Sequence, residues 1–428
     1  MGNAPSSTFT RFAVLVSAAL LPVGPLQAQT ATLTGRVLDQ ETRVPLAGAV
    51  VTVQPQGLQT LSDDEGRFRI GGVIPGMVRL EAAFLGYASA VETSIMARTS
   101  RATFVSLELR PEAIEVEGIT VEADAFRARE DAPTSTQRLT EVEIRRNPGG
   151  LGDISRSLLS LPGVLGGVDS RNDLLVRGGG PGENAYYLDG IRIPQINHFA
   201  TQGTAGGALA LVNADFIQDA TFFTGGFPVR YGDALSSVLL IENRPGTRDG
   251  IAGDVTLGAS EAGITLDGPL GDEATWLLSV RRSYLQFLFE ALDLPIRPDY
   301  WDGQVSLLWE PTSRDRLTFT GIGAIDEFGI IEPDADDDFE KREIFQRVLD
   351  NDQKTYTVGG TYRRLFGDDG LVRVRASYSF TDYRFADEDA LGSTLLTNTS
   401  LERETRLEAE GEMGMGPSLR AGAGVELV

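Results

Sequence analysis

The stretch Leu371-Val-Arg-Val-Arg-Ala-Ser-Tyr-Ser-Phe-Thr-Asp-Tyr-Arg-Phe385 alternates between two kinds of side chain. Apolar and aromatic residues occupy every second position from Val372 to Phe380, arginine and serine lie between them, and Thr381 follows. A β-strand places successive side chains on opposite faces, so this pattern predicts a strand with one apolar and one polar face. A lipid-facing strand backed by water has this pattern, and so does the amphipathic sheet of a soluble sandwich.

Strand length favours the membrane alternative. The alternating segments 353–366 and 371–385 exceed the roughly 5–6 residues of an ordinary strand. About nine strands are expected in this part of the chain, near 252–259, 261–268, 274–288, 302–311, 315–325, 353–366, 370–385, 402–413 and 417–428. Long loops are expected near 289–301, 326–352 and 386–401. Short turns at one end and long loops at the other are typical of outer-membrane barrels.

Aromatic side chains lie near several of the expected strand ends. They are Trp276, Trp309, Tyr356, Tyr362 and Tyr383. Tyrosine and tryptophan gather where such barrels meet the two membrane–water interfaces, so these residues are candidates for an aromatic girdle. Packing in an ordinary protein core is the alternative.

The composition excludes several kinds of chemistry. The 428 residues carry a formal net charge of −23, whereas a nucleic-acid-binding protein needs a basic patch. The chain has no cysteine and a single histidine, His198, which excludes thiolate nucleophiles, disulfides and zinc sites with two histidines. We therefore expect no catalytic residues, no metal site and no cofactor, and no nucleic acid among the partners.

Residues 1–28 have the features of a secretory signal peptide. Arg11 precedes the apolar run Phe12–Leu21, and Leu26-Gln27-Ala28 provides a small-residue cleavage site. The run makes about 15 Å of helix, half of a ~30 Å bilayer core. A buried N-terminal helix is the alternative. The mature chain is expected to be exported, and either soluble or inserted as β-strands.

Residues 30–110 alternate in short segments separated by turns, which predicts a small β-sandwich. The turn Asp63-Asp-Glu-Gly66 is the clearest, because glycine can adopt the positive φ that it needs. The motifs Gly35-Arg-Val, Pro45-Leu-Ala-Gly-Ala-Val50, Ser62-Asp-Asp-Glu-Gly-Arg-Phe68 and Gly86-Tyr87 resemble the carboxypeptidase regulatory-like domain, a transthyretin-type sandwich. The resemblance implies an interaction or spacer module and no peptidase activity.

Residues 125–246 mix short helices and short strands, which predicts a compact α/β unit. Thr140-Glu-Val-Glu143 forms a capping box at the start of a helix, and Leu151, Ile154, Leu158 and Leu161 make a helical stripe that ends before Pro162. Strands are expected at 174–177 and 185–188, the second closed by the turn Asp189-Gly190.

Four motifs in this unit resemble the plug domain of TonB-dependent outer-membrane receptors. They are Asp153-Ile-Ser-Arg-Ser-Leu-Leu-Ser-Leu-Pro-Gly-Val164, Val176-Arg-Gly-Gly179, Tyr187-Leu-Asp-Gly-Ile191 and Phe223-Thr-Gly-Gly-Phe-Pro-Val-Arg-Tyr-Gly-Asp-Ala-Leu-Ser-Ser237. The residues that carry the resemblance are Pro162, Gly163, Arg177, Gly178, Gly179, Asp189, Gly190, Gly225, Gly226, Tyr231 and Gly232. We expect the glycines to form tight turns, and His198 to be a loop residue of the plug and no ligand.

The barrel strands in this sequence are too few to enclose such a plug. A plugged lumen needs about 22 strands of about ten residues each, which is more than the segment 247–428 holds. We therefore expect a multi-domain, mainly β protein whose residues 250–428 are the first strands of an incomplete transmembrane antiparallel β-barrel. The chain is expected to be a fragment of a longer receptor.

By resemblance, the function is uptake of a siderophore, cobalamin or an oligosaccharide across a Gram-negative outer membrane. The implied partners are the C-terminal domain of TonB with its inner-membrane energising complex, outer-membrane lipid and the ligand. TonB pairs with an extended segment by strand addition. Gly118, Ile119, Thr120, Val121 and Glu122, in the linker 111–124, are the candidate TonB box. An ordinary linker or plug strand is the alternative, and the sandwich is expected in the periplasm.

Two further classes and one further site remain open. A secreted or surface carbohydrate-binding or adhesion protein leaves the order of the plug motifs unexplained, and a periplasmic glycosidase lacks a distinguishing carboxylate pair. The run Asp334-Ala-Asp-Asp-Asp-Phe-Glu340 has carboxylates that suit Ca²⁺. It lacks the glycine of an EF-hand, so a solvated acidic external loop is favoured.

Overall fold

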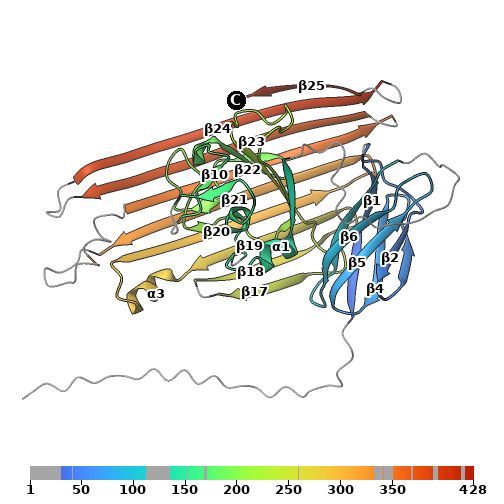
Figure 1. The fold of residues 1–428 in the computed structure, drawn as a ribbon, viewed down its shortest axis with the longest axis horizontal. Coiled ribbons are helices and arrows are strands. Elements are labelled where there is room, and N and C mark those ends of the chain that lie inside the picture. Colours follow the sequence, from blue (N-terminus) through green and yellow to red (C-terminus); the bar gives the residue numbers. More distant parts are fainter. Residues whose placement is uncertain are drawn as a thin grey trace, which may run out of the picture.

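The structure is a computed structural model. It describes residues 30–40, 42–111, 135–150, 152–167, 171–258, 260–331, 341, 350–367, 370–388, 394–415 and 420–428. The expected signal peptide, the candidate TonB box Gly118–Glu122 and the acidic run Asp334–Glu340 lie outside these residues. Within them the chain is mainly β and forms a sandwich, a small α/β unit and a large sheet (Figure 1).

The N-terminal unit is the expected β-sandwich. One sheet has the order β4-β1-β7, with β1 (Ala31–Asp39), β4 (Arg67–Val73) and β7 (Thr103–Leu109). The other has the order β3-β2-β5-β6, with β2 (Val50–Gln54), β3 (Leu58–Leu61), β5 (Gly76–Ala83) and β6 (Ala90–Ala97). Alternate residues of both sheets form one core, which includes Leu33, Val51, Phe68, Leu80 and Leu107. Gly66 has the predicted positive φ, 72°.

The second unit centres on a five-stranded sheet with the order β12-β11-β16-β15-β8. These strands are β8 (Thr136–Thr140), β11 (Asn184–Leu188), β12 (Ile191–Ile193), β15 (Ile217–Phe223) and β16 (Ser237–Asn243). Two helices, α1 (Glu141–Arg146) and α2 (Ile154–Leu159), pack beside the sheet. The short elements are β9 (Val164–Gly166), β10 (Leu174–Val176), η1 (Pro181–Glu183), β13 (Asn197–His198) and β14 (Leu209–Ala210).

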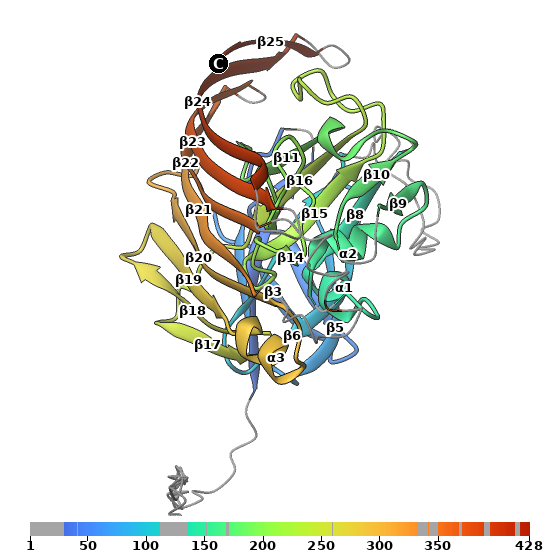
Figure 2. The ribbon, with the colours of Figure 1, turned by 90° about the vertical axis from the view of Figure 1, so that its left-hand side faces the viewer.

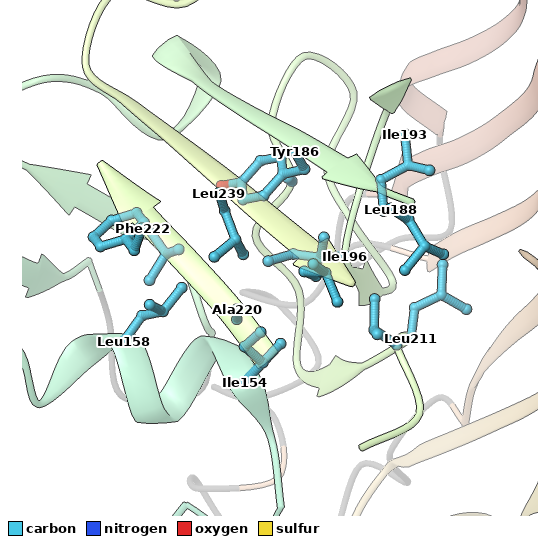
Figure 3. Close-up of a cluster of buried hydrophobic side chains, with 14 of the residues drawn as sticks. Ile154, Leu158, Tyr186, Leu188, Ile193, Ile196, Leu211, Ala220, Phe222 and Leu239 are labelled. Atoms are coloured by element: carbon cyan, nitrogen blue, oxygen red, sulfur yellow. The ribbon is translucent and has the colours of Figure 1, made fainter. Parts of the chain in front are cut away.

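The core of this unit lies between the helices and the sheet. Figure 3 shows Ile154 and Leu158 of α2 pointing toward Phe222 and Ala220 of β15. Phe222 is completely buried, and such burial contributes about 1.5–3 kcal/mol. The capping box at Thr140 is present as predicted, because the Thr140 backbone N–H donates to Glu143 at 2.8 Å.

The third unit is a nine-stranded antiparallel sheet in sequence order. Its strands are β17 (Ala252–Leu257), β18 (Glu261–Leu270), β19 (Ala274–Ser283), β20 (Ile296–Trp309), β21 (Asp315–Ile330), β22 (Asp350–Phe366), β23 (Gly370–Glu388), β24 (Thr394–Gly414) and β25 (Arg420–Leu427). The sheet curves round one side of the α/β unit (Figure 2). In the described residues β17 and β25 do not pair, so the barrel is incomplete, as expected.

Several strand boundaries differ from the prediction. The strand expected at 274–288 ends at Ser283, and helix α3 (Leu285–Ala291) follows it. The long loops expected near 289–301 and 386–401 are shorter, because β20 begins at Ile296 and β24 at Thr394. Pro298, within the expected loop 289–301, lies in β20 opposite Phe328. Pairing with the neighbouring strand extends these strands beyond what local sequence predicts.

The two faces of the sheet differ as the alternation predicts. Outward side chains such as Leu278, Phe319 and Val374 are 42–44% exposed. Inward ones such as Ser279, Thr320 and Arg375 are buried.

Tyr383 does not belong to the aromatic girdle for which it was a candidate. It is 3% exposed and its hydroxyl donates to Gln195 of the α/β unit at 3.3 Å. Tyr383 shares the parity of Arg373 and Arg375 along β23, so it faces inward with them. Trp309 and Tyr356, by contrast, are 43% and 42% exposed.

None of the helices in the described ranges is both long enough and apolar enough to cross a membrane.

Candidate functional site: the plug and its contacts with the barrel wall

The glycine-rich motifs of the α/β unit meet in space. The Arg177 backbone N–H donates to the carbonyl of Gly163, which follows Pro162, at 2.9 Å. A Cβ on Gly225 would lie 3.3 Å from a guanidinium nitrogen of Arg177. Arg177 itself is exposed and has φ of 50°. The motifs therefore form a set of tight turns around the Arg177 segment.

Gly178 and Gly179 have different reasons to be glycine. Gly178 has φ of 85°, which side chains rarely tolerate. Gly179 has no positive φ, but a Cβ there would lie 1.8 Å from the hydroxyl of Ser236. Ser236 in turn donates to the carbonyl of Val176 at 2.8 Å. A close approach of two chain segments therefore requires Gly179.

The turn Asp189-Gly190 connects the unit to the sheet. Both residues have positive φ, 51° and 81°, in a two-residue hairpin between β11 and β12. Thr320 of β21 donates to the Asp189 carboxylate at 2.6 Å, and Thr361 of β22 donates to its carbonyl at 3.2 Å. Burial raises the pKa of the Asp189 carboxyl, and hydrogen bonds from Thr320 and Asn243 oppose that rise.

The motif around Tyr231 brings a cation to β24. Gly225 and Gly226 have φ of 148° and 63°, and the Tyr231 ring lies 5.1 Å from that of Tyr187. A Cβ on Gly232 would lie 3.9 Å from a carboxylate oxygen of Glu426 on β25. The neighbouring Arg230 pairs with Glu412 at 2.8 Å and with Glu410 at 3.8 Å.

Arg230 was missed by the sequence analysis, although it stands between the predicted residues. The signal was present in the alternate glutamates of 404–412, which need cations on the facing surface. Arg375 of β23 supplies further charge, because it pairs with Glu408 at 2.6 Å and with Glu410 at 3.2 Å. These residues form one charged contact between the unit and the wall.

His198 is a second point of contact. It lies in β13 and is completely buried between carboxylates of two wall strands. Its Nδ1 lies 2.7 Å from Asp326 of β21, and its Nε2 lies 3.2 Å from Asp302 of β20. Burial lowers the pKa of the ring, but Asp326 and Asp302 outweigh burial and raise the pKa of His198 to about 9. The ring is therefore a cation at neutral pH.

The surroundings hold this cation firmly. Tyr300 stacks on the His198 ring at 3.9 Å between centroids. Asp302 also accepts from Arg281 at 2.9 Å, and Asp326 accepts from Gln353 at 2.6 Å. The Phe199 backbone N–H donates to Asp326 at 2.8 Å. His198 was expected to be an ordinary plug loop residue, whereas it anchors the plug to the wall.

Other buried polar contacts follow β18 and β19. Arg244 donates to Asp267 at 2.9 Å, and Asp267 is completely buried. The side-chain amide of Asn213 donates to Ser279 at 2.7 Å and to Thr265 at 3.2 Å. Buried hydrogen bonds and an ion pair therefore also join the unit to β18 and β19 of the wall.

The sandwich lies at the short-turn end of the sheet. Arg36 of β1 donates to Glu310, in the turn after β20, through two nitrogens at 2.5 and 2.7 Å. Arg101 pairs with Asp254 of β17 at 2.9 Å, and Arg98 pairs with Glu141 of α1 at 2.7 Å. The sandwich thus contacts both other units.

Within the described ranges, no three histidine, aspartate or glutamate side chains are grouped to hold a metal ion.

Comparison with known proteins agrees with this architecture. Residues 32–110 match the carboxypeptidase regulatory-like domain, and residues 128–238 match the TonB-dependent receptor plug domain. The TonB-dependent transporter Oar of Myxococcus xanthus is 28% identical over 246 residues, which are 55% of this chain and 22% of Oar. The siderophore receptor PirA of Acinetobacter baumannii has the same fold, with a TM-score of 0.50 and 17% identity over 68% of this chain and 47% of PirA.

A plug seated on the polar face of an outer-membrane-type sheet defines a plugged β-barrel receptor. The chain carries the plug domain of TonB-dependent receptors and an N-terminal carboxypeptidase regulatory-like domain, as the sequence motifs predict. Members of this family are outer-membrane receptors and transporters, and it is not an enzyme family. The chain spans 22% of the length of the curated relative that it matches.

Proposed function

We propose that this chain forms the plug and the adjoining wall of a transporter that takes up a scarce nutrient across the outer membrane. One observation carries the proposal. The plug is fixed by buried polar contacts to the inner face of a sheet whose outer face is apolar and exposed. A wall with lipid outside and water inside accounts for both faces. The alternative, a secreted adhesion module, does not explain why the outer face of the sheet is apolar and exposed.

Energy is delivered by TonB in this proposal. The candidate TonB box, Gly118–Glu122, precedes β8 in the chain, and β8 is an edge strand of the plug sheet. Among the described strands, only β15 pairs with β8, from Thr136 opposite Phe223 to Thr140 opposite Asp219. An edge strand is separated more easily than a central one, because it has a single set of ladder hydrogen bonds. Force on the linker would therefore act first on the β8–β15 pairing.

The ligand is a siderophore, cobalamin or an oligosaccharide in this proposal, and it binds at the long-loop end of the barrel. The sandwich then lies in the periplasm, because Arg36 contacts Glu310 in a short turn and short turns face the periplasm in such barrels. Cleavage of the sandwich by a protease added to the periplasm, but not to intact cells, tests this orientation.

A proline substitution tests the energised step in the full-length receptor. Ile119→Pro removes a backbone N–H that strand addition needs, so we expect uptake to stop while ligand binding to whole cells persists. Ala128→Pro, six residues after the candidate box, is the control and should transport normally. Transport by Ile119→Pro at the wild-type rate would reject the assignment of the box. If wild-type cells bind no member of any of the three ligand classes, the proposal that the protein takes up a nutrient is rejected.

A further inference from the structure

Three arginines lie side by side on the inner face of the wall. Arg316 of β21 is directly opposite Arg363 of β22, and Arg363 is directly opposite Arg373 of β23. Thr361, two residues from Arg363 on the same strand, donates to the plug carbonyl of Asp189. The three arginines therefore face the lumen and not the lipid. Like charges directly opposite each other on neighbouring strands destabilise a sheet.

Among the described residues, two carboxylates form ion pairs with this row, and Asp189 and Glu242 of the plug also interact with Arg316 through charge. Glu410 pairs with Arg373. Glu310 lies 3.9 Å from Arg316 and is shared with Arg36 at 2.5 Å and Arg248 at 3.2 Å. Three guanidinium groups thus share Glu310, and Arg363 forms no ion pair with a carboxylate of the described residues.

Arg363, in the middle of the row, lacks a partner for its Nε atom. This N–H group is buried and donates to no acceptor in the part of the chain that the structure describes. A buried donor without an acceptor is destabilising, because its lost hydration is not replaced. The neighbouring Arg364 contrasts with it, because its side chain is 57% exposed and pairs with Asp315 at 3.2 Å.

The geometry points to an oxyanion-binding site at the short-turn end of the lumen, formed by Arg316 and Arg363. Guanidinium groups bind phosphate and carboxylate oxygens through two parallel hydrogen bonds, and a bound oxyanion would separate the two like charges. The ligand class is a phosphate or carboxylate group, either of a free anion or of a larger molecule leaving the lumen. The site goes beyond the proposed uptake, and its existence does not depend on TonB.

Phosphate binding by the purified full-length receptor tests the site. We would titrate inorganic phosphate into the receptor in detergent by isothermal calorimetry, with sodium chloride keeping the ionic strength constant. Wild type should bind phosphate saturably, and Arg363→Gln should bind it at least about tenfold more weakly, because a charged hydrogen-bonding partner is lost. Arg364→Gln is the matched control, since it removes an adjacent arginine that has another partner, and it should bind as wild type does.

A second arm distinguishes the sources of the anion. Acetate in place of phosphate tests a carboxylate, and a soluble phosphomonoester such as glycerol phosphate tests a group carried by a larger molecule. Competition of either with phosphate in wild type supports one shared site. If Arg363→Gln does not fold, Arg363→Lys keeps the charge but loses the planar fork, and weaker binding by this variant supports the site. Equal binding by wild type and the Arg363 variants, or no binding by wild type, would overturn the inference, whatever the uptake assay gives.

Discussion

The contact between His198 and two wall carboxylates yields the sharpest prediction. We would replace His198 by glutamine, which keeps a polar side chain but removes the positive charge. Asp326 and Asp302 would then lie buried without the cation that lies 2.7 and 3.2 Å from them. Breaking a buried ion pair on one side costs about 3–5 kcal/mol, because the remaining charge stays desolvated. Gln353 and Arg281 also donate to these carboxylates and remain in the variant, so we expect the loss of stability to lie at the lower end of this range.

The raised pKa of His198 gives an independent magnitude for this stabilisation and the direction of its pH dependence. Burial disfavours the charged ring, but the two carboxylates raise the pKa of His198 from its ordinary 6.5 to about 9. A pKa raised by folding means that the folded protein binds the proton more tightly. The stabilisation is therefore complete below pH 6.5 and is lost as the pH rises through 9. The interval between the two pKa values corresponds to about 3 kcal/mol, of which less than about 1 kcal/mol remains at pH 9.

The assay compares the unfolding of wild type and His198→Gln in the purified full-length receptor at pH 6, 7.5 and 9. Other groups face this site from β18, β19 and β20, namely Glu261, Arg281 and Tyr300. They are present in both proteins, so the difference between the two reports His198. We expect wild type to be more stable by about 3 kcal/mol at pH 6 and by less than about 1 kcal/mol at pH 9. A difference that does not change with pH would refute the reasoning.

Two further substitutions test the packing of the plug and the docking of the sandwich. Gly179→Ala should lower the free energy of unfolding by about 1–3 kcal/mol, because the new Cβ would lie 1.8 Å from a serine hydroxyl. Gly71→Ala, where nothing lies within 4 Å, is the thermal-unfolding control, and equal effects would contradict the packing argument. Arg36→Ala removes the two hydrogen bonds to Glu310, so the sandwich should separate and the radius of gyration in X-ray scattering should rise. Arg43→Ala breaks an ion pair within the sandwich and should leave that radius unchanged.

The local elements and their order follow from the amino-acid sequence alone. Alternation along segments such as 371–385 determines which side chains share a face, because a strand has a period of two whatever it packs against. The capping box at Thr140 and the turn Asp189-Gly190 depend only on neighbouring residues, and both are present. The order of the motifs was sufficient to identify the plug, because each motif forms a local turn or a helix end.

The tertiary structure alone decided which distant residues meet. His198 and Asp326 are separated by 128 positions, and neither has a local pattern that marks it as half of a contact. Arg363 became notable only when strand register placed it between Arg316 and Arg373. Tyr383 was a girdle candidate by residue type, with core packing as the alternative, and parity and the plug place it inside. Periodicity is a property of one strand, but charge pairing and burial depend on what folding brings to the other side.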